Sequence, residues 1–171
     1  KMGIVGVRLQ LELRGVPCLP LEMCPPPKKE TCVSRSFGQA VTSLDELKEA
    51  IALRTTRLGE KLRLQQQAAT LLQVFARTSA FDEKPYSNAV TLTLPTATNY
   101  TPELLEHALH GAEVIFQAGY RFKKAGVIAM GLLPETIEQG HLFELRRDRQ
   151  RDRGLMSVIQ GYFVLRCDVL C

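Results

Sequence analysis

Residues 89–110 read AVTLTLPTATNYTPELLEHALH, and this stretch contains the pattern of a strand followed by that of a helix. Within 89–96, apolar and hydroxyl side chains alternate, as they do in a strand with one buried face. Thr101 as N-cap and Pro102 at the first helical position predict a helix from 101 to 119, closed by Gly119. The stretch therefore predicts a half-buried strand that leads into an amphipathic helix.

The two segments before this stretch are predicted to be a helix and then a strand. Residues 42–66 predict a helix that opens with a capping box, in which Ser43 is the N-cap and Glu46 follows three residues later. Residues 69–81 predict a strand, and residues 82–88 predict a turn. One buried stripe on the helix follows from its apolar spacing: Leu44, Leu47, Ile51, Leu58 and Leu62.

Strands are also predicted at the two ends of this region, over 32–41 and 120–133. The resulting order is β-α-β-β-α-β. This order predicts an α+β, ferredoxin-like fold, in which two helices cover one face of a four-stranded sheet. The other face is then open, but the fold alone assigns no function to it.

The N-terminal part reads differently. Residues 4–13 predict a short helix, and residues 23–32, MCPPPKKETC, predict an extended tether because three prolines stand in a row. Four units are therefore expected: a helical segment over 1–20, a tether over 21–32, the ferredoxin-like domain over 33–134 and a flexible tail over 135–171.

The composition is that of a soluble globular protein, with 45% hydrophobic and 23% charged residues in a chain of 171. No run approaches the roughly 20 apolar residues that span a bilayer, and the first residues lack the pattern of a signal peptide. The five cysteines fit neither a metal spacing nor a disulfide framework, so we expect free thiols in a reducing cytoplasm. A net charge of +4 permits a polyanionic partner.

The predicted strands carry cations and hydroxyl groups, whereas most carboxylates fall on the predicted helices. Such a sheet face suits phosphate oxygens and has little means of reading bases. The alternative is that these cations are merely solvated strand ends. The residues in question are Ser34, Arg35, Ser36, Arg77, Thr78, Ser79, Thr91, Thr93, Arg121, Lys123 and Lys124.

Several other classes of site have no support in the sequence. The central strands lack the aromatic motifs that stack on single-stranded RNA. His107 and His110 have only Glu103 and Glu106 nearby, so we expect solvent-facing histidines and no metal site. There is no phosphate-binding glycine loop, no nucleophile with a base, and no acidic pair for magnesium.

A family resemblance rests on several strings in combination. LELRGVPCLPLE at 11–22, SRSFG at 34–38, GEKLRLQQQ at 59–67, FARTSAF at 75–81 and QAGYRFKKAGV at 117–127 resemble the C-terminal region of Y-family translesion DNA polymerases of the UmuC type. The resemblance runs from about residue 4 to about residue 159, starting at the junction of thumb and little finger.

The resemblance implies a little finger domain that lays its sheet on primer–template duplex and grips backbone phosphates. The metal-binding palm would lie outside this chain, so we expect no polymerase activity from it alone. No cofactor is expected in this part, whereas the parent enzyme would use Mg²⁺. The implied DNA contacts are Arg35, Ser36, Gly38, Arg77, Thr78, Ser79, Arg121, Lys123 and Lys124.

QGHLF at 139–143 matches the pentapeptide with which such polymerases bind the sliding clamp. Leu142 and Phe143 would enter an apolar pocket and Gln139 would bond at its rim. Alternatively, the Leu-Phe pair folds back onto the domain.

The last residues, 161–171, depart from the family pattern. Contacts of the full-length protein with a UmuD-type dimer and a recombinase filament are therefore in doubt for this chain. Two hypotheses follow: a cytoplasmic DNA-binding part of an error-prone polymerase that recruits the clamp, or a ferredoxin-like protein–protein module that never meets DNA.

Overall fold

The computed structural model describes residues 3–18, 28–135, 151–152 and 154–159. Its elements follow in the order α1 (Ile4–Leu13), β1 (Glu30–Val41), α2 (Leu44–Leu64), β2 (Gln67–Arg77), β3 (Ser87–Thr98), α3 (Thr101–Ile115) and β4 (Phe122–Pro134). From β1 to β4 this is the predicted β-α-β-β-α-β sequence of elements.

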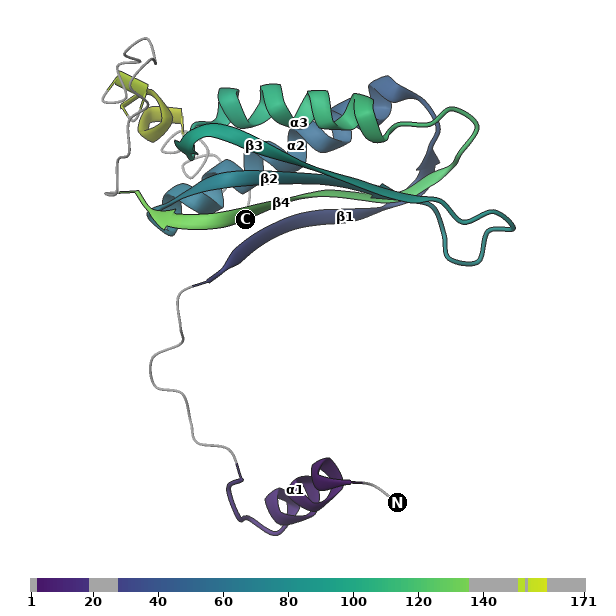
Figure 1. Ribbon diagram of the computed structural model, residues 1–171, viewed down its shortest axis with the longest axis vertical. Helices are drawn as coiled ribbons and strands as arrows, with labels where there is room; N and C mark the ends of the chain where they lie inside the picture. The colour runs from purple at the N-terminus through teal and green to yellow at the C-terminus, as the bar shows by residue number, and fades with distance from the viewer. Residues whose placement is uncertain (1–2, 19–27, 136–150, 153, 160–171) are drawn as a thin grey trace, which may run out of the picture.

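The four strands form one sheet in the order β1-β4-β2-β3, and all neighbours are antiparallel. Parallel strands β1 and β2 are thus separated by β4, and β3 and β4 by β2, which is the split β-α-β arrangement. Both α2 and α3 lie on the same side of the sheet (Figure 1). The predicted ferredoxin-like fold is confirmed, and among the described elements both α2 and α3 leave the other face of the sheet uncovered.

The core lies between the two helices and the sheet. Alternate residues of β2, namely Leu72, Val74 and Ala76, are fully buried toward the helices, as their period of two predicts. From α2, the predicted stripe residues Leu47, Ile51, Leu58 and Leu62 are fully buried as well, whereas Leu44 is only half-buried. Truncating one such leucine to alanine costs about 2–5 kcal/mol in typical cores.

Two glycines allow the layers to approach closely. A Cβ on Gly111 of α3 would lie 2.8 Å from Val74 Cγ2 of β2, and a Cβ on Gly59 of α2 would lie 2.7 Å from Thr101 Oγ1. Arg63 secures the second contact, because its Nη1 donates to Thr101 Oγ1 and to the Asn99 carbonyl, both at 2.9 Å. At these two glycines, the helix backbone therefore comes close to its neighbour: α2 to Thr101 of α3, and α3 to Val74 of the sheet.

Several predicted boundaries differ from the structure, among them the end of β2, which is Arg77 and not residue 81. Helix α3 has Tyr100 as N-cap, since Thr101 is already helical and its hydroxyl accepts from Arg63. The same helix ends at Ile115, four residues before Gly119, because Phe116 adopts an extended backbone. Strand β1 begins at Glu30, inside the predicted tether.

The predicted N-cap of α2 is correct, because the Glu46 N–H donates to Ser43 Oγ at 3.2 Å. Helix α1 by itself has no buried residue, and Gly15 follows it with a left-handed φ of 82°. Residues 154–159 are helical. No helix in the described part of the chain is both long and apolar enough to span a bilayer.

Candidate nucleic-acid interface

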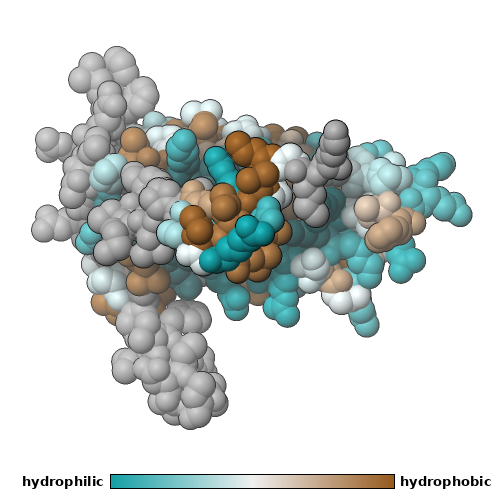
Figure 2. All heavy atoms as spheres, turned by 90° about the horizontal axis from the view of Figure 1, so that it is seen from below, coloured by the Kyte–Doolittle hydropathy of each residue, from teal (hydrophilic) through white to brown (hydrophobic). Residues whose placement is uncertain are grey.

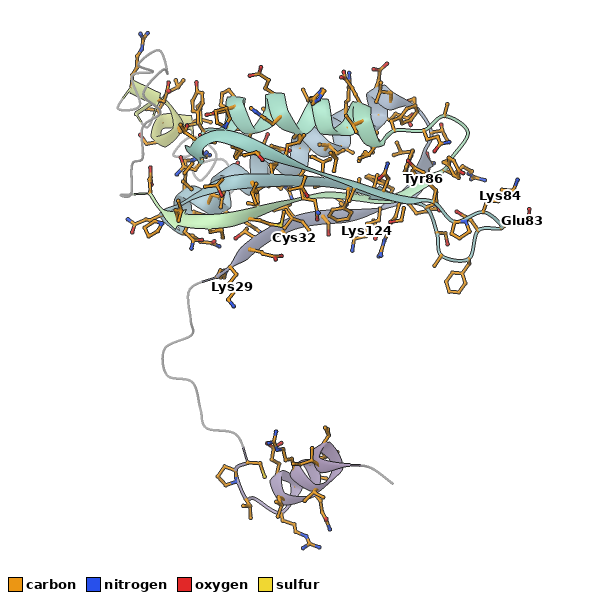
Figure 3. All side chains as sticks on the ribbon, viewed as in Figure 1. Lys29, Cys32, Glu83, Lys84, Tyr86 and Lys124 are labelled. Atoms are coloured by element: carbon orange, nitrogen blue, oxygen red, sulfur yellow. The ribbon has the colours of Figure 1, made fainter. Side chains whose placement is uncertain are left out.

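One row of residues crosses the whole open face at one end of the sheet. Ser36 of β1 is paired with Lys124 of β4, Lys124 with Arg77 of β2, and Arg77 with Ser87 of β3. Residues that are directly opposite in an antiparallel sheet point to the same face. The side chain of Lys124 extends away from the helices (Figure 3). We call these four residues the cationic row: two cations flanked by two hydroxyl groups.

Away from this row the open face is not basic. The next rows toward the other end contain Gly126 and Phe75, then Ile128 and Gln73, then Met130 and Leu71. The predicted hydroxyl groups do lie on this face, because Ser34 is paired with Gly126, Thr91 with Gln73 and Thr93 with Leu71. The predicted cations do not cover the face, because those that point to it gather where β2 ends and β4 begins. In the direction away from the cationic row, apolar side chains such as Ile128 and Met130 are mixed with uncharged polar ones such as Gln73, and Glu30 lies at the far end.

A cleft of about 520 Å³ opens beside the cationic row. It collects residues from all four strands and from the loop between β2 and β3: Ser36, Phe37, Arg77, Thr78, Ser79, Ala80, Pro85, Tyr86, Ser87, Lys123 and Lys124. Six of the nine predicted DNA contacts line it. Figure 2 shows that the right-hand end of the molecule, where the β2–β3 loop lies, is mainly hydrophilic.

Thr78 lines the cleft but uses its hydroxyl inside the protein. Its Oγ1 accepts from the Tyr86 N–H at 2.9 Å, and the residue is only 7% exposed. The Tyr86 hydroxyl donates to the Ile115 carbonyl at 3.1 Å, and its ring stacks on that of Tyr120 with centroids 4.5 Å apart. Thr78 and Tyr86 therefore close the β2–β3 loop. Because the Thr78 hydroxyl is already hydrogen-bonded within the protein, it is poorly available to a ligand.

Ser79 also has local partners. Its Oγ accepts from the Phe81 N–H at 3.2 Å, and its N–H donates to the Asp82 carboxylate at 3.1 Å. These bonds shape the tip of the loop, where the Phe81 side chain is 98% exposed. Ser79 thus contributes to the rim of the cleft mainly by holding the loop in place.

The remaining predicted contacts lie in separate places on the domain. Lys123 Nζ donates to the Gly38 carbonyl at 3.3 Å, which joins β4 to the irregular part of β1 after Ser36. Arg121 is exposed just before β4 and does not line the cleft. Arg35 is paired with Ala125, a core residue, so it lies on the helix side of β1 and away from the cationic row.

The helix layer carries both signs of charge. Lys48 of α2 and Glu113 of α3 form a salt bridge at 2.7 Å, and this hydrogen bond lowers the pKa of the Glu113 carboxyl. Helix α2 also bears Arg54 and Arg57 in its middle. The expectation that the helices carry mainly acidic charge therefore does not hold for α2.

Sequence reasoning missed Ser87 and Arg54. Ser87 could have been found from the register of the β2–β3 hairpin, which places it opposite Arg77. Arg54 falls between Ile51 and Leu58 in the buried stripe of α2. Because arginine is rarely buried without a partner, its position in this stripe could have indicated a binding site.

Other candidate features remain without a structural test. The predicted clamp motif at 139–143 lies outside the described residues. Among the residues that are described, no group of three or more His, Cys, Asp or Glu side chains is placed to hold a metal ion. Cys18 and Cys32 are free thiols.

The family model of the impB/mucB/samB family C-terminal domain matches residues 28–142, which include the whole sheet and both of its helices. The chain belongs to the impB/mucB/samB family. UmuC of Salmonella typhimurium is 35% identical over 159 residues, and these cover 92% of this chain. SamB of the same species and MucB of Escherichia coli are each 34% identical over 161 residues, which cover 93% of this chain.

The resemblance to the UmuC group inferred from sequence is thus confirmed. The chain spans only 38% of the length of each of these impB/mucB/samB relatives.

Proposed function

We propose that this chain is the DNA-binding portion of an error-prone translesion polymerase, acting in DNA damage tolerance and mutagenesis. The cationic row would hold phosphates of a primer–template duplex, without reading its sequence. The single observation that carries this proposal is the pairing of Arg77 with Lys124 on the open face, next to a cleft that also admits Lys123.

The chemistry of the cleft favours a polyanion. Arginine presents a planar fork that matches two phosphate oxygens, and lysine adds a point charge. Ser36 and Ser87 at the two ends of the row can donate hydroxyl hydrogen bonds to the same oxygens. Backbone contacts of this kind position a duplex and carry no sequence information.

The whole protein would then combine this grip with activities outside the chain. We propose that a palm using Mg²⁺, a UmuD-type dimer and a recombinase filament act with it in the cytoplasm. Clamp recruitment would use Gln139, Leu142 and Phe143, with the aliphatic and aromatic pair inserted in an apolar pocket. A labelled peptide covering 137–145 titrated with sliding clamp tests this last step. Saturable binding that is lost when Leu142 and Phe143 become alanine is expected.

The test of the DNA proposal is a titration of fluorescent primer–template duplex with matched charge reversals. Lys124→Glu changes the cationic row, whereas Lys61→Glu makes the same charge change at an exposed position of α2. We expect Lys124→Glu to weaken duplex binding by about tenfold or more and Lys61→Glu to leave it near the wild-type value. Equal effects of the two changes would mean that only net charge matters.

The second hypothesis, a protein-binding sheet, is favoured by the apolar rows that contain Ile128 and Met130, which are only half-buried. It predicts that Lys124→Glu leaves duplex affinity unchanged, because no duplex would be bound at the open face. The same titration therefore separates the two functions.

A further inference from the structure

Arg54 is a buried cation without a full set of partners. The residue is only 6% exposed, and its Nε has no hydrogen-bond acceptor among the described residues. A guanidinium remains charged at neutral pH and is costly to bury without an anion or an acceptor. A buried donor without a protein partner is uncommon in native structures, and its acceptor can be water, an ion or a ligand.

Two more guanidinium groups surround it. Arg57 follows one helical turn later on α2, and Arg35 approaches from the helix side of β1. Burial, and then the charges of Arg57 and Arg35, lower the pKa of Arg54. Within the described part of the chain, none of these three arginines forms a salt bridge with a carboxylate. Three like charges therefore converge around one unsatisfied donor.

Apolar side chains flank these cations on the outer side of α2. Leu53 precedes Arg57 by four residues and is 48% exposed, and Leu64 follows Arg57 by seven residues and is 72% exposed. Residues four and seven apart lie on the same flank of a helix. A phosphate group would leave the exposed leucines uncovered. A peptide with acidic and apolar side chains could pair with the arginines and also cover the leucines.

We propose that Arg35, Arg54 and Arg57, with Leu53 and Leu64, form a docking site for an acidic amphipathic segment of a partner protein. Carboxylates of that segment would accept from the exposed guanidinium groups of Arg35 and Arg57, in the bidentate geometry that arginine favours, and would offset the buried charge of Arg54 behind them. The apolar side chains of the segment would cover Leu53 and Leu64. The site lies on the helix side of the domain and is separate from the cationic row.

The chain allows a specific fluorescent reporter for this site because it contains no tryptophan. Leu53→Trp places a sole indole at the site and keeps an apolar side chain there. Phe81→Trp places a sole indole at the exposed tip of the β2–β3 loop and serves as the matched control. The probe is a synthetic amphipathic peptide with glutamates on one face and leucines on the other.

With the whole chain at fixed ionic strength, we expect the glutamate peptide to shift the indole emission of the Leu53→Trp protein to the blue. The emission of the Phe81→Trp protein should stay unchanged. In the Leu53→Trp background, Arg35→Glu and Arg57→Glu, both at exposed positions, should each weaken peptide binding by about tenfold. Arg54→Gln is expected to do the same, and circular dichroism shows whether that variant is folded. A peptide with lysine in place of glutamate should not bind.

Three results would overturn the proposal: no emission shift in the Leu53→Trp protein, an equal shift in the Phe81→Trp protein, or unchanged peptide affinity in both Arg35→Glu and Arg57→Glu. Primer–template DNA that displaces the peptide, and that binds less well to Arg57→Glu, would assign the cluster to phosphate instead. Because Lys124→Glu should not affect the peptide, failure here leaves the DNA proposal at the cationic row intact.

Discussion

Arg77 and Lys124 lie directly opposite each other on the adjacent strands β2 and β4, with their side chains on the same open face. Like charges directly opposite in a sheet destabilise it, so this pair costs the free protein stability. An anion held between the two side chains would convert that repulsion into binding energy. Under the proposed function, this pair is where a phosphate of the duplex would bind.

Replacing Lys124 by glutamine removes the repulsion. We expect the Lys124→Gln variant to be more stable than wild type by about 0.2–1 kcal/mol, although it binds duplex less well. Urea denaturation measures the difference, with Lys61→Gln at an exposed position of α2 as control. A variant that is less stable than wild type would show that Lys124 is a structural residue.

Gly126 is required by close packing on the open face. A Cβ there would lie 2.5 Å from Ser34 Cβ and 2.8 Å from Phe75 Cζ. We expect Gly126→Ala to lower the free energy of unfolding by about 1–3 kcal/mol, as overpacking does. Gly38→Ala meets nothing within 4 Å and should change stability little. Thermal melts of the two variants check this, and equal melting temperatures would contradict it.

Thr78 should be needed for stability more than for DNA affinity. Thr78→Val leaves the Tyr86 N–H without its acceptor in a place that is largely closed to water. We expect a loss of about 1–3 kcal/mol, read from chemical denaturation, with the duplex affinity of the folded variant nearly unchanged. A large loss of affinity at full stability would instead give the hydroxyl a ligand.

The salt bridge between Lys48 and Glu113 has a pH signature. The pKa of Glu113 is lowered from 4.5, first by the hydrogen bond from Lys48 and then by its charge. The stabilisation is therefore present above the unfolded pKa and is lost as the pH falls through the folded pKa. In Lys48→Met, an NMR titration should show the pKa of Glu113 returning upward. Because Glu113 is exposed and Lys48 is only half-buried, the gain in stability is small.

The sequence predicted the elements of the fold well because their signals are local. The alternation in β2 and β3 indicated the buried face, and Ser43 with Glu46 indicated the start of α2. The end of α3 was predicted too late, because the backbone becomes extended at Phe116 although no glycine or proline marks that position.

The site was predicted less completely, because it depends on pairing between distant strands. Arg35 and Ser36 are neighbours in sequence, yet they point to opposite faces, and Ser36 alone meets Lys124. Thr78 belonged to the right region, but its hydroxyl is used by Tyr86, which the sequence could not show. Register and internal hydrogen bonds thus decided which predicted residues face the cleft.

The most direct test of the DNA proposal is the salt dependence of binding to primer–template duplex. For wild type, the logarithm of the binding constant should fall linearly with the logarithm of salt concentration, by about 0.9 per neutralised phosphate. We predict that Arg77→Gln and Lys124→Gln each reduce this slope by about one contact, whereas Lys61→Gln leaves it unchanged. Identical slopes in all four proteins would contradict phosphate binding at the paired cations of β2 and β4.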